Sequence, residues 1–320
     1  VNYEFREIRE EDISSITGLF IENYFRVLEK HPNLPAKYAT RDAVNDYVSW
    51  MVGNGVGIVA IDNSDEIVGY MTAIEIDDFK NSGKGLYTPE WGHGAAVDDP
   101  EWLYSQLYTY LYDACIGENC HVHAITIMDH DEHLIRESFF NGYGMLLIDG
   151  IKKVEDEIPQ KTPYKVRQAK VSDLDQIVAI LDTHYDYMYN SPIFLFSHAE
   201  DLKDSVRAYL EDETIILWVA EQNDKLIAVM KTQYNADNAS TIVMDEKSLS
   251  IQETHVIDEA RNQKVAKSLL THVEKWAFEH SFERLTVDFE TANILARRFW
   301  LKYFQPVCHS MIRYIDDRIE

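Results

Sequence analysis

The stretch 248-SLSIQETHVIDEARNQKVAKSLLTHVEKWA-277 changes its hydrophobic period part-way along. Leu249 and Ile251 alternate with polar residues, which is the period of a half-buried strand, and Glu253 and His255 are candidates for the same face. In the second part the apolar residues recur every three or four positions, which predicts an amphipathic helix. The stretch therefore predicts a strand that runs directly into a helix.

Three basic residues, Arg261, Lys264 and Lys267, lie at this junction. The N-terminus of a helix exposes backbone N–H groups without partners and carries a partial positive charge. Cations at this end oppose the helix dipole unless an anion balances them, so we interpret the junction as a phosphate site. The alternative is a solvated basic turn.

The composition indicates a folded protein with about two domains. The 320 residues are 46% hydrophobic and 12% aromatic, which is enough for real cores. The 55 acidic residues outnumber the 30 basic ones, and the formal charge of −25 disfavours nucleic acid and anionic membranes as partners. No apolar run approaches the roughly 20 residues of a membrane span. Three cysteines without metal-type spacing favour a reducing compartment, so we expect a cytoplasmic protein.

The chain repeats one plan at an offset of about 160 residues. The matched positions are Phe5-Arg6 with Val166-Arg167, Asp12 with Asp173, Val59-Ala60 with Val219-Ala220, Val97 with Val256, and Phe139-Phe140 with Phe299-Trp300. Matches in this order at nearly constant spacing predict a duplicated domain. We place the two domains at residues 1–160 and 161–320, joined by a segment that contains Pro159 and Pro163.

Each half is expected to contain a strand, two helices, a β-hairpin, a strand that leads into a helix, and then a strand, a helix and terminal strands. Strands outnumber helices, and several are linked by hairpins. The predicted fold class is therefore α/β of the α+β kind: two tandem domains, each a mixed, largely antiparallel, partly split sheet flanked by helices.

This order of elements, the loop 261–266 and the segment 293-NILARRFWLKYF-304 together resemble the GNAT superfamily of acetyl-CoA-dependent N-acetyltransferases. The resemblance covers both halves and implies a tandem GNAT chain. In that family a loop with the pattern Gln/Arg-x-x-Gly-x-Gly/Ala holds the pyrophosphate of coenzyme A at a helix N-terminus. Arg261 and Ala266 match this pattern, whereas Lys264 stands where the family has glycine. A lysine there must either point outward or add a charged contact to a phosphate.

The resemblance implies a set of cofactor-binding positions on the loop and on the elements beside it. They are His255, Val256, Arg261, Asn262, Gln263, Lys264, Val265, Ala266, Asn293 and Trp300. Backbone groups near the first two would hold the pantetheine arm and polarise the thioester. Asn293 is either a cofactor contact or a helix-entry residue beside a Thr291 cap.

Trp300 stands where the family often has a tyrosine that protonates the departing thiolate. An indole N–H is not a practical acid, but a thiol with a pKa of about 8.5 is a fair leaving group without one. Tyr303 and Tyr314 are the possible substitutes.

A general base is useful because an alkylamine with a pKa of about 10.4 is neutral in only about one part in 2,500 at pH 7. Glu253 and His255 are the catalytic candidates, since alternate residues of a strand share a face and one or both can reach the amine, directly or through water. The alternative is that both line a sheet edge or pair locally.

The first half lacks these features when it is compared at a constant offset of 159. Positions 261, 264 and 266 then fall on Trp102, Ser105 and Leu107, and Glu253 and His255 fall on Gly94 and Ala96. Asp98 and Asp99 stand at the corresponding helix entry and would repel a pyrophosphate. We therefore expect residues 1–160 not to bind the cofactor in the family manner.

The sequence predicts an N-acetyltransferase whose second domain transfers an acetyl group from acetyl-CoA to a small-molecule amine or peptide amine by direct attack. The resemblance implies no metal and no covalent enzyme intermediate, and we leave a homodimer open. Two alternatives are a non-catalytic acyl-CoA-binding or regulatory module, favoured by Lys264 and Trp300, and a structural scaffold without ligand. The excess of acidic residues favours polyamines, aminoglycosides or basic peptide ends as acceptors.

Overall fold

The structure is a computed structural model that describes residues 3–80, 82–113, 120–156, 158–159, 161–196, 201–234, 236, 240–316 and 318. The chain divides into two compact units, which we name unit 1 (residues 1–149 and 306–320) and unit 2 (residues 150–305). It passes between them within β7 (Gly144–Lys153) and at the start of β13 (Gln305–Tyr314). The boundary predicted at Gln160 falls on a residue outside the described ones and stays a prediction.

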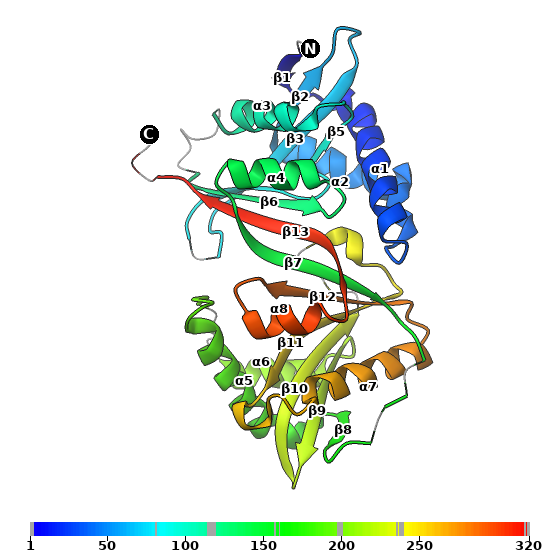
Figure 1. Cartoon of the computed structure of the whole chain (residues 1–320), viewed down its shortest axis with the longest axis vertical. Coiled ribbons are helices and arrows are strands. Elements are labelled where there is room, and N and C mark those ends of the chain that lie inside the picture. The colour runs from blue at the N-terminus through cyan, green and yellow to red at the C-terminus, as the bar shows by residue number, and fades with distance from the viewer. Residues whose placement is uncertain are drawn as a thin grey trace. The chain divides into compact units, whose positions relative to one another are not determined.

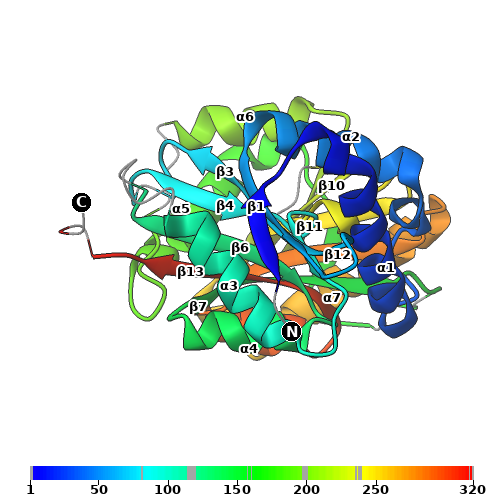
Figure 2. The same cartoon turned by 90° about the horizontal axis from the view of Figure 1, so that it is seen from above.

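Unit 1 is a mixed sheet with helices on both faces (Figure 1). Its elements are β1 (Glu4–Glu7), α1 (Ile13–Lys30), α2 (Arg41–Asn54), β2 (Val56–Ile61), β3 (Ile67–Ile76), β4 (Gly85–Thr88), β5 (His93–Ala95), α3 (Pro100–Asp113), β6 (Val122–Met128) and α4 (Glu132–Phe140), with parts of β7 and β13. The strand order is β1-β2-β3-β4-β6-β13-β7, and β5 pairs with β3. Only β4 and β6 are parallel among the neighbours whose register is described. Helices α1 and α2 cover one face, and α3 and α4 the other (Figure 2).

Unit 2 repeats this arrangement. Its elements are β8 (Lys165–Gln168), α5 (Leu174–Tyr189), α6 (Leu202–Glu211), β9 (Ile215–Gln222), β10 (Lys225–Tyr234), β11 (Ser248–Val256), α7 (Val265–Glu279), β12 (Arg284–Glu290) and α8 (Ile294–Trp300). The strand order is β8-β9-β10-β11-β12, with the end of β7 beside β12, and the pair β11–β12 is parallel. The predicted α/β class and mixed sheets are confirmed.

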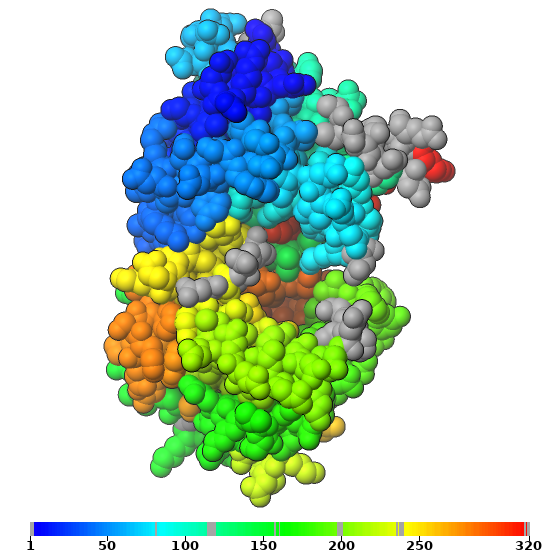
Figure 3. All heavy atoms as spheres, turned by 180° about the vertical axis from the view of Figure 1, so that it is seen from behind, coloured from blue at the N-terminus to red at the C-terminus, as the bar shows by residue number. Residues whose placement is uncertain are grey.

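The central strands of unit 2 are apolar because both faces of the sheet are covered. β9 and β10 read IILWVAEQ and KLIAVMKTQY, which are nearly continuous apolar runs rather than alternating ones. Val219 and Val229 pack against α5 and α6, while Trp218 meets Trp276 of α7 edge to face at 6.1 Å. The turn of the β9–β10 hairpin projects from the surface of unit 2, and that of the β2–β3 hairpin from unit 1 (Figure 3).

In both units an arginine pairs with the aspartate that precedes a helix, α1 in unit 1 and α5 in unit 2. Arg6 donates to Asp12 at 2.7 and 2.9 Å, and Arg167 donates to Asp173 at 2.7 and 3.0 Å. Each aspartate also accepts the backbone N–H of the residue three positions before it, at 2.8 and 2.7 Å. Bidentate, charge-assisted pairs of this kind fix both side chains and the turn that leads into the first helix. The repeated pair therefore supports the duplication at atomic detail.

A β-bulge in β11 changes which residues share a face. The register between β10 and β11 shifts by one residue between Ile251 and Thr254. Lys231 of β10 therefore stands opposite both Gln252 and Glu253. His255 consequently lies against α5, as Glu253 does, whereas Ile251 lies on the α7 side. The expectation that Glu253 and His255 share the face of Ile251 was wrong, since one extra residue reverses the alternation.

The strands β11 and β12 are paired over only part of their length. The pairing runs from Ser248 opposite Arg284 to Ile251 opposite Val287. Beyond that point Thr254–Val256 pair with β10 alone, among the strands whose register is described. The sheet of unit 2 is therefore split at this end, and the backbone edge that faces away from β10 is left without a partner strand.

Candidate active site

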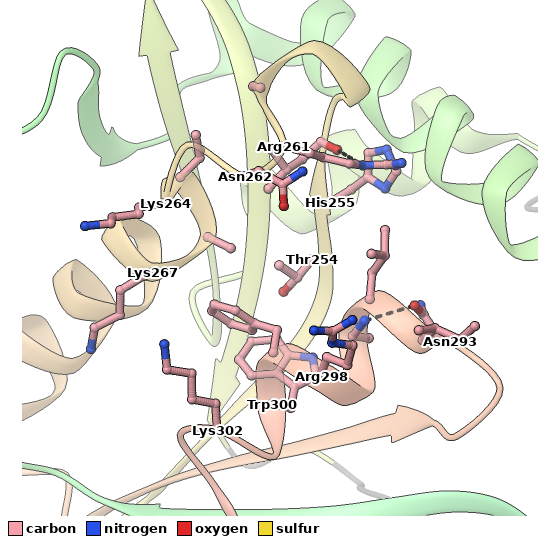
Figure 4. A pocket seen from close by; sticks show the side chains of 18 of the residues that line it. Thr254, His255, Arg261, Asn262, Lys264, Lys267, Asn293, Arg298, Trp300 and Lys302 are labelled. Carbon is pink, nitrogen blue, oxygen red and sulfur yellow. Dashed lines mark hydrogen bonds between the residues drawn. The ribbon is translucent and has the colours of Figure 1, made fainter.

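A pocket of about 560 Å³ lies where β11 and β12 part (Figure 4). Its walls are the end of β11, the loop 257–264, the first turn of α7, α8 and part of α5. The predicted cofactor positions that line it are His255, Val256, Arg261, Asn262, Lys264, Val265, Ala266, Asn293 and Trp300. Gln263 is not among the lining residues, because its side chain turns back to donate to the carbonyl of Glu259 at 2.7 Å.

The N-terminus of α7 has no side-chain cap. Lys264 stands in the N-cap position with φ 64° and ψ 20°, and it makes no capping hydrogen bond. This left-handed conformation is the one that glycine adopts most readily, and a lysine costs about 1 kcal/mol more there. The backbone thus has the form that favours the family's glycine, while the exposed lysine side chain adds a cation beside the N–H groups of the first turn.

Four cationic side chains line the pocket without an acidic partner. Lys264, Lys267, Arg298 and Lys302 form no ion pair within the part of the chain that the structure describes. The ammonium groups of Lys267 and Lys302 lie 4.7 and 5.3 Å from the centre of the Tyr303 ring. The three lysines gather on one side of the pocket (Figure 4), next to the open end of α7. This concentration of charge favours an anion.

Arg261 has a different role, because its guanidinium is engaged locally. It forms an ion pair with Asp258 at 2.7 Å, donates to the carbonyl of Val256 at 3.2 Å and lies 5.1 Å from the centre of the Tyr187 ring. These contacts tie the loop to the end of β11 and to α5. Arg261 therefore holds the loop in place, and the lysines supply the unpaired charge.

His255 of β11 has a buried imidazole that faces α5. It is 5% exposed, its Nε2 lies 3.2 Å from the hydroxyl of Thr183, and its ring centre is 5.2 Å from that of His184. Burial, with smaller contributions from His184 and from the Arg261 guanidinium, lowers the pKa of His255 to about 3. Such an imidazole is neutral at pH 7 and a weak base.

Glu253 does not line this pocket and lies on the α5 and α6 face of the sheet. Its carboxylate is 3.6 Å from the ammonium of Lys231, which in turn lies 4.0 Å from the centre of the Tyr209 ring. Burial and the Glu253 carboxylate raise the pKa of Tyr185. Sequence reasoning missed Lys231. The available signal was a lysine directly after the apolar run of β10, where a buried residue is expected.

Asn293 caps α8. Its side-chain oxygen accepts the N–H of Ala296 at 3.0 Å and the hydroxyl of Tyr187 at 3.3 Å. The cap is therefore Asn293 itself and not Thr291, which the helix-entry alternative had named. Asn293 remains a pocket-lining residue whose oxygen is already engaged.

Trp300 is only 4% exposed and packs edge to face on Phe304 at 5.4 Å. It forms part of the wall of the pocket. Of the two tyrosines considered as substitutes, Tyr303 lines the pocket, and Tyr314 belongs to unit 1 and is not a lining residue.

Comparison with known proteins agrees with this geometry. Residues 179–304 match the family model described as Acetyltransferase (GNAT) family. The match assigns residues 179–304 to a GNAT-family domain. No curated protein sequence matches the chain. The family and the fold indicate an N-acyltransferase.

Solved structures extend the likeness in fold to the whole chain. A GCN5-related N-acetyltransferase from Sphaerobacter thermophilus has a TM-score of 0.60 and 12% identity, over 98% of this chain and 95% of that one. The glucosamine N-acetyltransferase region of a fungal multi-domain GH3 β-N-acetylglucosaminidase has a TM-score of 0.55 and 14% identity. This match covers 98% of our chain and 38% of the fungal one. At these identities the likeness is one of fold.

Strand pairing shows which residues of unit 1 correspond to the pocket residues of unit 2. The paired residues run Arg6, Val59, Tyr70, Gly94 across unit 1 and Arg167, Val219, Val229, His255 across unit 2. Gly94 therefore stands in the place of His255, and Gly92, two residues earlier, in that of Glu253. The constant offset of 159, which paired Gly94 with Glu253 and Ala96 with His255, was wrong because insertions change the offset along the chain.

The loop before the helix differs in length between the units. Residues 96–99, four in number, join β5 to α3, whereas residues 257–264, eight in number, join β11 to α7. Trp102, Ser105 and Leu107 lie within α3 and are not loop residues, which corrects the earlier pairing. Unit 1 thus has a short connection whose charged residues are both acidic, where the GNAT domain of unit 2 has a longer loop that contains Arg261 and ends at Lys264.

Two further properties bear on partners. The described residues contain no group of three or more His, Cys, Asp or Glu side chains placed to hold a metal ion. None of the described helices combines the length and the apolar character needed to cross a membrane.

Proposed function

We propose that unit 2 transfers an acetyl group from acetyl-CoA to an amine. The observation that carries this proposal is the uncapped N-terminus of α7 at the split between β11 and β12, next to lysines that have no acidic partner among the described residues. A volume of about 560 Å³ lies in the usual range for small-molecule sites. Unit 1, with its short acidic connection, is proposed not to bind the cofactor.

The residues of the pocket fit the two ends of acetyl-CoA differently. The N–H groups of the first turn of α7, with Lys264 and Lys267, suit the pyrophosphate. The backbone edge of Thr254–Val256, which lacks a partner strand, suits the amide groups of the pantetheine arm, much as it would accept a further strand. The phosphate end and the thioester end thus meet separate parts of one pocket.

The reaction then requires one proton transfer. The amine nitrogen attacks the thioester carbonyl carbon, the C–S bond breaks, the amine proton passes to a base, and coenzyme A leaves as its thiolate. We propose Glu253 as the base, directly or through a water molecule, because its side chain is 23% exposed on the face of β11 that it shares with His255. His255 is the weaker candidate, since its pKa of about 3 makes proton uptake unfavourable.

A second candidate function is an acyl-CoA-binding module that performs no transfer. Trp300 favours it, because an indole N–H cannot protonate the departing thiolate. The two candidates share the cofactor site and differ only in turnover.

Thiol release separates them. The full chain is mixed with acetyl-CoA and a panel of amines, and free coenzyme A is measured over time, with calorimetry of acetyl-CoA binding beside it. The proposal predicts binding and amine-dependent thiol release. Binding without release would support the binding module, and absence of binding would contradict both.

A further inference from the structure

His255 has one ring nitrogen with a partner and one without. Its Nε2 lies 3.2 Å from the hydroxyl oxygen of Thr183 in α5. Its Nδ1 makes no hydrogen bond with the described residues. The Nδ1 of the neighbouring His184 is fully buried and unpartnered, whereas the Nδ1 of His255 is not fully buried. Because His255 lines the pocket, this nitrogen is open to a ligand there.

The hydroxyl of Thr183 decides which ring nitrogen carries the proton. A hydroxyl group has a single hydrogen, and Thr183 donates it to the carbonyl of Ile180, one turn earlier in α5, at 2.7 Å. Its oxygen can then only accept from His255, so the imidazole proton is on Nε2. Since burial lowers the pKa of His255 to about 3, the ring is neutral at pH 7, and Nδ1 has a lone pair and no proton.

Unit 1 shows that sheet and helix can pack here without an imidazole. Gly94 stands at the corresponding position, and a Cβ added to it would lie 2.9 Å from the amide nitrogen of Asn23 and 2.9 Å from the ring of Tyr70. Both of these side chains are buried, so α1 and β3 fill the space in which a side chain at this position would begin. An acceptor without a partner on a largely buried residue is costly unless a ligand or water meets it. His255 therefore calls for a role beyond packing.

We propose that Thr183 fixes this tautomer of His255 so that Nδ1 accepts a hydrogen bond from the N–H of the attacking amine. The inference rests on the proposed transfer to an amine. His255 contacts the acceptor, and Thr183 acts through His255 as a positioning residue. A neutral primary amine has two N–H groups and one lone pair, so a hydrogen bond from one N–H to Nδ1 restricts the direction in which the lone pair points.

The contact gives separate tasks to the two residues that face α5 from β11. An imidazole with a pKa of about 3 accepts a hydrogen bond at pH 7 but does not take up the proton. The proton that the amine loses as the C–N bond forms therefore passes to Glu253, and the C–S bond breaks to release the thiolate. The opposite tautomer of His255 would present an N–H to the amine and occupy the lone pair that has to attack.

Nitrogen NMR of the histidine rings tests the tautomer directly. The full chain, labelled with nitrogen-15 in its histidine rings, is measured at pH 7, and His255→Phe identifies the signals of this residue. In the wild-type chain the proton should lie on Nε2. Thr183→Val has the shape of threonine without the hydroxyl, so the form with the proton on Nδ1 should become populated. Thr183→Ser keeps the hydroxyl and should keep the wild-type form.

Steady-state thiol release tests the contact with the amine. The acceptor is whichever of benzylamine, spermidine, glucosamine and L-lysine reacts best. In Thr183→Val, kcat/KM for the amine should fall about tenfold, the effect of about one hydrogen bond, and Thr183→Ser should recover most of it. The affinity for acetyl-CoA should not change. Thr109→Val is the matched control, because it removes a hydroxyl that donates to a helix carbonyl at 2.8 Å in α3 of unit 1.

Four results would overturn the inference. They are a proton on Nδ1 in the wild-type chain, no change of tautomer in Thr183→Val, a changed tautomer with kcat/KM within about twofold of wild type, and a loss of acetyl-CoA affinity in its place. The wild-type spectrum decides the tautomer even where Thr183→Val does not fold. A proton on Nδ1 with thiol release would leave the proposed transfer standing. The expected tautomer without thiol release from any amine would contradict the proposed transfer and, with it, the amine contact.

Discussion

Unit 1 and unit 2 share one arrangement of strands, which we call the frame, and have different segments where a strand leads into a helix. Both have the same run of three antiparallel strand pairs followed by a parallel pair, and both begin with the same arginine–aspartate pair. They differ where the strand meets the helix. Unit 2 has eight residues and unpaired lysines there, and unit 1 has four residues that include Asp98 and Asp99.

The difference shows that the frame and the site depend on separate features of the sequence. The frame depends on apolar strands and on a bidentate ion pair that each unit contains. The candidate site depends on local additions: four extra loop residues, a bulge at Gln252 and Glu253, and the lysine opposite that bulge. A duplicated fold can therefore retain its stability in a copy that has no such additions.

The largest expected effect comes from Glu253→Gln. Unit 1 has Gly92 at the corresponding position, so the substitution removes a charge that unit 1 lacks as well. Removing the base should lower kcat for amine-dependent thiol release by about 10²- to 10³-fold. The affinity for acetyl-CoA should not change, and Glu246→Gln, at an exposed position before β11, should leave both quantities as they are. A kcat within about threefold of wild type would exclude Glu253 as the base.

Charge reversal at the start of α7 should reproduce the acidic entry of unit 1. In Lys267→Glu the affinity for acetyl-CoA should fall by about 30-fold, about 2 kcal/mol, because a charge-assisted contact is lost and a repulsion is added. Lys275→Glu, on an exposed part of the same helix, is the matched control. Calorimetry measures both. Equal losses in the two variants would mean a general charge effect instead of a phosphate site.

Both units should lose stability when this pair is weakened. Asp12→Asn should lower the free energy of unfolding by about 2 kcal/mol, because it removes the charge of a bidentate pair. Asp173→Asn should lower it by less, because Arg167 keeps Glu221 at 2.9 Å as a second acidic partner. Urea denaturation followed by hydrogen exchange in each unit measures this. A larger loss in Asp173→Asn than in Asp12→Asn would contradict this expectation.

The same pairs predict a dependence on pH. Hydrogen bonds from Arg6 and Arg167 hold the pKa values of Asp12 and Asp173 below the ordinary range. Since the folded pKa is the lower one, each contribution is complete above the unfolded pKa of about 4 and is lost as the pH falls through the folded value. The gap in stability between wild type and either variant should therefore narrow in acid and stay constant between pH 6 and 8.

The smallest effect should come from Lys264→Gly, which restores the residue of the family pattern. Glycine relieves a left-handed conformation, so the free energy of unfolding should rise by about 1 kcal/mol while the affinity for acetyl-CoA falls. Asn262 has a φ of 61° too, but asparagine tolerates this region, so Asn262→Gly should gain only a few tenths of a kcal/mol. Thermal melts of both variants compare them. Equal gains would show that the strain at Lys264 is not specific to lysine.

Much of the frame could be predicted from the sequence because its signals are local. The change of period from Leu249 to the apolar stripe of α7 marks a strand and a helix, and the repeated Arg6 and Asp12 reveal the second copy. The cations at the helix entry also mark the pocket, since helix and loop are contiguous in the chain.

The rest depends on contacts that the sequence does not show. Gln252 and Glu253 are both polar, so no hydrophobic pattern marks the extra residue that reverses the faces of β11. Lys231 meets Glu253 only because two strands pair in one register. The pattern of β13 does not show which strands it joins, and in the structure most of it groups with unit 1, beside β6.

Calorimetry of acetyl-CoA binding to the full chain tests the contrast between the units most directly. Our interpretation predicts one molecule bound per chain, with an affinity that falls about 30-fold in Lys267→Glu and does not change when Asp98 and Asp99 of unit 1 are replaced by asparagine. Two molecules per chain, or one molecule whose affinity ignores Lys267→Glu, would contradict it.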